Sequence, residues 1–213
     1  MAERTTTIAK QFEDLPQQRE AVTLGMWTFL ATEVLFFGGL FLVYSVYRHF
    51  YFNAFAAASK HTDVVYGTVN SVILITSSLT MALGVRAAKL IQYRNTIRFL
   101  LLTVCLGLAF LAVKGFEYHK DITDRLVPGL DFNPDLPLHG QIFFWLYWTM
   151  TGLHALHVII GLGVISTMIG LLSRRNGRPV HAHSIENAGL YWHFVDIVWI
   201  YLYPLLYLVG RHS

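Results

Sequence analysis

Charge and cysteine are both scarce in this chain of 213 residues. Charged residues make up only 14% of it and hydrophobic residues 54%, which lies outside the usual balance of a soluble globular domain. The single cysteine, Cys105, excludes an intrachain disulfide and a thiolate metal cluster, so we expect this thiol to serve in packing. The composition indicates an integral membrane protein.

The sequence also lacks the common catalytic motifs. It has no phosphate-binding glycine loop, no serine nucleophile elbow and no zinc helix with paired histidines around a glutamate. Its net charge of +3 could suggest an anionic partner, but the basic residues lie between apolar segments, where they act as topology signals and contact lipid headgroups. We therefore expect no nucleic-acid binding and no active site within this chain.

Five apolar segments are long enough to cross a bilayer, which takes about 20 helical residues. The sequence predicts an all-α polytopic membrane protein, a bundle of five transmembrane helices in residues 24–213 that follows a cytoplasmic N-terminal tail in residues 1–23. Glycines inside these segments are expected to allow close helix packing. The segments are Leu24 to Tyr47, Gly67 to Ala87, Ile97 to Phe116, Gln141 to Leu172 and Gly189 to Val209, and the glycines are Gly38, Gly39, Gly152, Gly161, Gly163 and Gly170.

The loops differ in their content of lysine and arginine, which predicts the orientation. One side carries Arg4, Lys10, Arg19, Arg86, Lys89, Arg94, Arg98, Arg174, Arg175 and Arg178, and the other side carries Arg48, Lys60, Lys120, Arg125 and Arg211. Because basic loops stay in the cytoplasm, we expect the N-terminus to be cytoplasmic and the C-terminus to lie outside.

Several ionisable residues fall inside the predicted spans, where each costs a few kcal/mol unless it has a partner. Glu33 lies on the order of 13 Å into the first span, near mid-depth. His193 and Asp196 are three residues apart and therefore share one face of the last helix. The others are Glu117, His154 and His157. These groups either bond to one another and hold the helices in register, or take part in proton uptake, or contact a neighbouring subunit or lipid headgroup.

Two further interpretations concern charges and metals. Lys114 and Glu117 stand near a span end, which favours a pair that reaches toward the membrane surface. His154 and His157 are too close on one helix to serve two stacked haems, and no thiolate is near to complete a zinc site. A single haem between His157 and His193 is an alternative, which would make the protein a small membrane electron carrier. Otherwise we expect no metal in this chain.

Four stretches resemble subunit III of the haem–copper respiratory oxidases, the cytochrome c oxidase family, in the family's order. They are Thr32-Glu33-Val34-Leu35-Phe36-Phe37, Asn70-Ser71-Val72-Ile73-Leu74, Thr151-Gly152-Leu153-His154-Ala155-Leu156-His157-Val158 and Tyr191-Trp192-His193-Phe194-Val195-Asp196-Ile197-Val198-Trp199. Glu117-Tyr118 and Glu186 also match family positions. His119 and Lys120 depart from the family pattern, in which an aromatic residue and a second acidic residue often follow the Glu-Tyr pair. The resemblance extends from about Leu24 to the C-terminus. It is to the five-span bacterial form of the family, which lacks the first two helices of the mitochondrial type. Without those helices, one wall of the family's lipid-binding cleft is missing.

The resemblance implies a non-catalytic accessory subunit of a terminal oxidase that reduces oxygen to water and pumps protons. In the family, subunits I and II bind the haems and copper, whereas subunit III binds no metal, packs on subunit I, holds phospholipid and sustains proton uptake. The expected location is the bacterial plasma membrane, and whether the oxidase joins a supercomplex with other respiratory complexes is left open by the sequence. The related accessory protein of nitric oxide reductase is the alternative within the superfamily.

Overall fold

The computed structural model describes residues 14–129, 132–137, 139–174 and 182–209, and these form helices joined by short connections. The helices are α1 (Leu15–Phe50), α2 (Phe52–Ser59), α3 (Val64–Lys89), α4 (Tyr93–Thr123), α5 (Gly140–Arg174) and α6 (Ala182–Tyr203), followed by a π-helical turn, η1 (Pro204–Leu208). No strand occurs in these residues. The predicted all-α class is confirmed.

Aspartates begin two of the long helices. The side chain of Asp14 accepts a hydrogen bond from the backbone N–H of Gln17 at the start of α1, and that of Asp63 accepts one from Val65 at the start of α3. Both aspartate side chains thus accept hydrogen bonds from backbone N–H groups that have no partner within the first helical turn. Asp63 also accepts a hydrogen bond from Lys120 at 2.7 Å, which lowers the pKa of the Asp63 carboxyl below its ordinary value.

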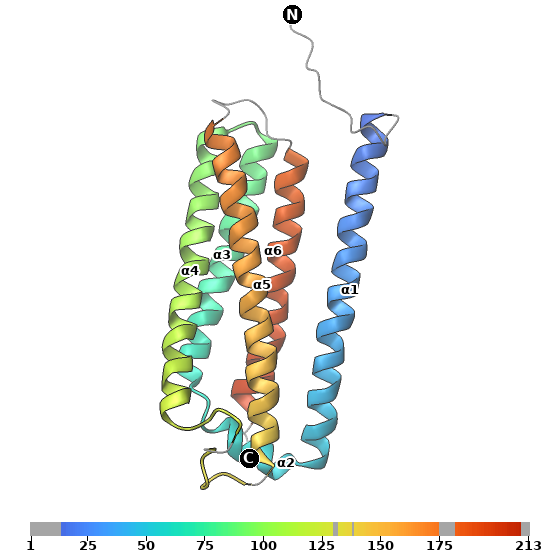
Figure 1. Ribbon diagram of the computed structural model, residues 1–213. Coiled ribbons are helices and arrows are strands. Elements are labelled where there is room, and N and C mark those ends of the chain that lie inside the picture. Colours follow the sequence, from blue (N-terminus) through green and yellow to red (C-terminus); the bar gives the residue numbers. More distant parts are fainter. Residues whose placement is uncertain (1–13, 130–131, 138, 175–181, 210–213) are drawn as a thin grey trace, which may run out of the picture.

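Figure 1 shows α3, α4, α5 and α6 as a bundle and α1 beside it, with α2 crossing at the lower end. We call the end at Lys89 and Tyr93 the upper end, and the end at Phe50 and Val64 the lower end. α6 packs against α1, α3 and α5. α1 buries the smallest share of its apolar stretch, 17% against 28–33% for the other apolar helices. It is therefore the least firmly held of the long helices.

Four helices are long and apolar enough to cross a membrane: α1, α3, α4 and α5. The expected fifth span falls on α6 and η1, and α6 is not among the four. Its polar residues explain the difference, since Asn187 and Asp196 are buried within the bundle, at 8% and 4% exposure. Neighbouring helices, rather than lipid, cover much of α6, so its sequence needs less apolar character than a lipid-facing helix does.

The glycine prediction is largely wrong. A side chain at Gly38, Gly39, Gly152, Gly163 or Gly170 would meet nothing within 4 Å, and of the six only Gly161 is in close contact, with Trp192. The close approaches occur elsewhere: a Cβ at Gly107 would lie 2.8 Å from Leu162 and 2.9 Å from Trp192. Spacing along one helix does not reveal which face meets a bulky neighbour.

We expect Gly107→Ala to lower the free energy of unfolding by about 1–3 kcal/mol, because the added methyl group overlaps the fully buried Trp192. Gly39→Ala is the matched control, since its methyl group meets nothing within 4 Å. Unfolding of the detergent-solubilised protein by a denaturing detergent would measure both. Equal stability of the two variants would contradict the packing seen at Gly107.

Candidate functional site

Glu33 and His157 form a hydrogen-bonded pair that joins α1 to α5. His157 Nε2 lies 3.1 Å from Glu33 Oε2, near the middle of both helices. The pair is mostly enclosed, with side-chain exposures of 12% for His157 and 19% for Glu33. Phe37 covers the imidazole edge-on at 5.2 Å between ring centroids. The structure thus supplies a partner for the costly carboxyl group predicted at mid-depth.

The hydrogen bonds of His157 fix where its protons are. Its Nδ1 lies 2.7 Å from the carbonyl oxygen of Leu153, and since a carbonyl oxygen only accepts, Nδ1 must carry a proton. The contact between Nε2 and Glu33 then requires one more proton, held either by the imidazole or by the carboxyl group. The pair therefore holds one shared proton and is neutral overall. Neutrality is what a position inside a bilayer favours.

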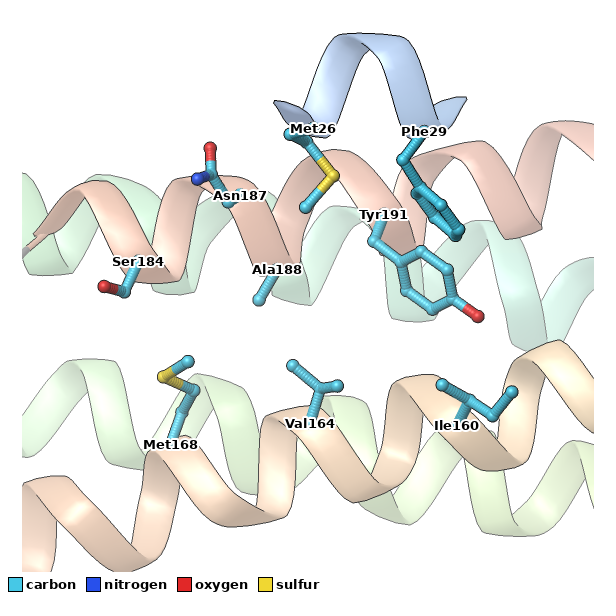
Figure 2. A pocket seen from close by; sticks show the side chains of 9 residues that line it. All are labelled: Met26, Phe29, Ile160, Val164, Met168, Ser184, Asn187, Ala188 and Tyr191. Carbon is cyan, nitrogen blue, oxygen red and sulfur yellow. The ribbon is translucent and has the colours of Figure 1, made fainter. Parts of the chain in front are cut away.

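A mostly apolar cavity of about 390 Å³ adjoins this pair between α1, α5 and α6. Figure 2 shows Met26 and Phe29 of α1 facing side chains of α5 and α6 across it. Tyr191 links the cavity to the pair, since it lines the cavity and donates a hydrogen bond to the carbonyl of His157 at 3.0 Å. The nine lining residues are Met26, Phe29, Ile160, Val164, Met168, Ser184, Asn187, Ala188 and Tyr191. Such a lining suits an acyl chain or another apolar group.

A second polar cluster lies toward the lower end, where Lys114 of α4 is fully enclosed. Its ammonium group donates to Glu117 at 3.0 Å, to the Tyr147 hydroxyl at 3.0 Å and to the Tyr207 hydroxyl at 2.6 Å. The side chains of Lys114 and Glu117 are 2% and 1% exposed. The pair exists, but the expectation that it reaches toward the membrane surface is wrong, because α5 and η1 supply partners inside the bundle.

The Lys114 cluster can satisfy all of its donors. The three N–H groups of the lysine meet three acceptors. Tyr207 donates to Glu117 at 2.6 Å, and Tyr147 lies 2.9 Å from both Glu117 and Asp121. Because Tyr147 has one proton, it can serve Asp121 while Lys114 and Tyr207 serve Glu117. The cluster is thus a closed hydrogen-bond network that ties α4, α5 and η1 together.

The remaining predicted site residues are not brought together. His193 bonds to Ser78 of α3, with 2.7 Å between Nδ1 and the hydroxyl oxygen, rather than to Asp196. Both carboxyl oxygens of Asp196 lack a hydrogen-bond partner among the described residues. His154 is fully buried, bonds to no described residue through either ring nitrogen, and packs against Phe110 and Trp199.

Sequence reasoning missed the groups that complete these clusters. Ser78, Tyr147 and Tyr207 lie on helices remote in sequence from the charges they contact, and nothing local marks them. Asp121 could have been found, because it lies four residues after Glu117 and therefore on the same helix face. Cys105, which was expected to serve in packing, is exposed on α4.

The geometry does not favour the haem alternative. Both ring nitrogens of His157 are engaged, with Glu33 and with the carbonyl of Leu153, so neither is free to bind a haem iron. Among the described residues, no group of three or more histidine, cysteine, aspartate or glutamate side chains is placed to hold a metal ion.

Comparison with known proteins decides the family. The profile described as cytochrome c oxidase subunit III matches residues 9–211. The chain belongs to the cytochrome c oxidase subunit III family. The resemblance predicted from the sequence is thereby confirmed, and with it the role of an accessory subunit of a haem–copper oxidase.

Individual relatives of this subunit III chain support the same assignment. The chain is 33% identical to cytochrome c oxidase subunit 3 of Thermostichus vulcanus over 193 residues, 88% of this chain and 87% of the relative. It is 30% identical to cytochrome c oxidase subunit 3 of Bacillus subtilis over 208 residues, 93% and 94% of the two chains. A heme-copper oxidase subunit I+III of Aeropyrum pernix is 33% identical over 205 residues, 92% of this chain but 24% of that protein.

Proposed function

We propose that this chain packs against subunit I of an oxygen-reducing, proton-pumping oxidase, with subunit II in the same complex, and sustains proton uptake over many turnovers. The observation that carries this is the family match over residues 9–211. The Aeropyrum relative, whose name joins subunits I and III in one chain, supports subunit I as the neighbour. In this proposal the haems and copper belong to the partner subunits, and association with further respiratory complexes remains a prediction.

The proposed orientation places the upper end in the cytoplasm of a bacterial cell and the C-terminus outside the plasma membrane. Arg86, Lys89, Arg94 and Arg98 gather where α3 passes into α4, which fits the retention of basic loops in the cytoplasm. The prediction also used Arg4, Lys10, Arg175, Arg178 and Arg211, which lie outside the described residues. We propose that α6 with η1 forms the fifth span, because it runs alongside α3 and α5 (Figure 1).

The cavity between α1, α5 and α6 is the proposed place for a phospholipid acyl chain. Its lining is mostly apolar, and α1, which forms one wall, is the least buried of the apolar helices. Through Tyr191 and Phe29, such a chain would cover one side of the Glu33–His157 pair.

Affinity isolation of the tagged chain from gently solubilised membranes tests the proposed function. We expect haem–copper subunits to co-isolate, visible as a haem absorption spectrum, and the isolate to consume oxygen. An untagged strain processed in parallel is the control. An isolate without haem-containing subunits would contradict the proposal, and turnover of nitric oxide in place of oxygen would assign the chain to a nitric oxide reductase.

A further inference from the structure

Asp196 is the buried ionisable group that the bundle leaves unsatisfied on an open face. Its residue is 4% exposed, and neither carboxyl oxygen has a hydrogen-bond partner among the described residues. The neighbouring Ser78 hydroxyl, which bonds to Nδ1 of His193, has one proton and can therefore serve at most one of the two carboxyl oxygens. Asn70 and His154 also have unbonded polar atoms, but each is 0% exposed, whereas Asp196 lines a groove that opens outward.

This groove runs between α3 and α6 and is formed by two adjoining hollows of about 360 and 400 Å³ that share Ala82 and His193. We call it the α3–α6 groove. Along α3 it extends from Ile75 to Lys89, which is roughly 21 Å of helix. Ala82 presents only a methyl group to the groove. Gly189 brings α6 close to α3, because a Cβ there would lie 2.9 Å from Val85.

The edges of the groove are apolar and exposed. Ile75, Leu79, Ile197 and Ile200 are between 51% and 60% exposed. At its upper mouth Lys89 and Glu186 bond to each other at 2.8 Å, so both charges already have a partner. The group that still lacks a hydrogen-bond donor is the carboxyl group of Asp196, which lies roughly 15 Å along α6 from Glu186. An occupant must therefore cover apolar edges and bring a hydrogen-bond donor to mid-depth.

We propose that the α3–α6 groove receives a transmembrane helix of a partner subunit that presents a side-chain N–H or O–H donor to Asp196. This inference rests on the proposed function, because it requires a partner in the membrane. A lipid fits less well, since its donors are in the headgroup at the bilayer surface while its acyl chains have none. A second copy fits less well too, because a two-fold contact would bring two Asp196 carboxyl groups together without adding a donor.

Photo-crosslinking from single cysteines in the intact complex tests the occupant. With Cys105→Ser as background, Leu79→Cys and Ile197→Cys carry a benzophenone maleimide at the groove, and Leu108→Cys carries it on α4. Leu108 is the matched control, since its 54% exposure is close to the 51% of Ile197. We expect both groove variants to crosslink to one transmembrane segment of another subunit, at least fivefold more than Leu108→Cys does. Mass spectrometry of the product should show a donor side chain within that segment.

Each other result overturns the inference. Crosslinks only to lipid, only to a second copy, or to a segment without a donor would reject the partner helix. If haem–copper subunits still co-isolate in that case, the proposed function stands and only the assignment of the groove fails. If no subunit co-isolates with the unmodified chain, the proposed function itself fails.

Substitution of Asp196 tests how much its predicted hydrogen bond stabilises the complex. Asp196→Ala should dissociate from the complex about tenfold faster in detergent, because the partner's donor is left unpaired. Asp196→Asn keeps an acceptor oxygen and should dissociate at nearly the native rate. Circular dichroism of the isolated chains shows whether each variant folds. Equal retention of folded Asp196→Ala and the native chain would reject the predicted hydrogen bond.

Discussion

Lys114→Met should lower the free energy of unfolding by about 3–5 kcal/mol, the usual effect of removing one member of a buried ion pair. The substitution keeps the aliphatic stem but removes the cation that bonds to Glu117, and it removes a donor to two tyrosine hydroxyls. Both carboxyl groups would then be enclosed without a cation. Equilibrium unfolding in mixed micelles, followed by tryptophan fluorescence, measures the change.

Lys120→Met is the matched control on the same helix. Lys120 also pairs with a carboxylate, Asp63 at 2.7 Å, but its side chain is 49% exposed, and such pairs contribute about 0–1 kcal/mol. The double substitution of Lys114→Met with Glu117→Gln should recover part of the loss, because it removes the unpaired charge as well. Similar losses for the two single lysine variants would show that burial does not set the strength of the Lys114 pair.

The Lys114 cluster also explains how the C-terminal turn is held. Pro204 begins η1, and proline cannot donate a backbone hydrogen bond, so the chain leaves α6 in a wider turn. Tyr207 in this turn bonds to both Lys114 and Glu117, and Tyr44 of α1 donates to the carbonyl of Leu205. The η1 turn is therefore attached to α4 and α1 by side-chain hydrogen bonds.

The helices could be predicted from the sequence because apolar length is a local property. Four of the five expected spans each lie within one helix of the structure, and the last falls on α6 and η1. Depth was also accessible: counting 1.5 Å per residue places Glu33 near mid-membrane, and the structure places it near the middle of α1. The hydropathy of α6 could not reveal that neighbouring helices bury it, because a helix covered by other helices needs fewer apolar residues than one that faces lipid.

Pairing between helices was beyond the sequence. His193 and Asp196 share a helix face by spacing, but the hydrogen bond of His193 goes to Ser78 on another helix. Lys114 was expected to reach the membrane surface because it is near a span end, and only the positions of Tyr147 and Tyr207 show why it remains inside. Such contacts depend on helix rotation and register, which a hydropathy pattern does not determine.

Glu33→Ala is expected to shorten the active life of the oxidase severalfold while leaving its haem spectra and its initial rate close to native. Glu33 and His157 hold α1 against α5 at mid-depth, and α1 has few other buried contacts. Removal of the carboxyl group leaves Nε2 of His157 without its partner, at a cost of about 1–3 kcal/mol in the free energy of unfolding. Oxygen consumption followed over many turnovers measures the active life.

Glu33→Gln separates the positioning of α1 from proton transfer through the pair. The Leu153 carbonyl keeps the proton of His157 on Nδ1, so in the neutral ring Nε2 can accept a hydrogen bond from the glutamine amide. The variant thus retains the link between α1 and α5 but cannot exchange a proton. We expect it to restore both stability and active life. A stable Glu33→Gln variant with slow turnover would instead show that the shared proton itself is used, and would overturn the positioning role.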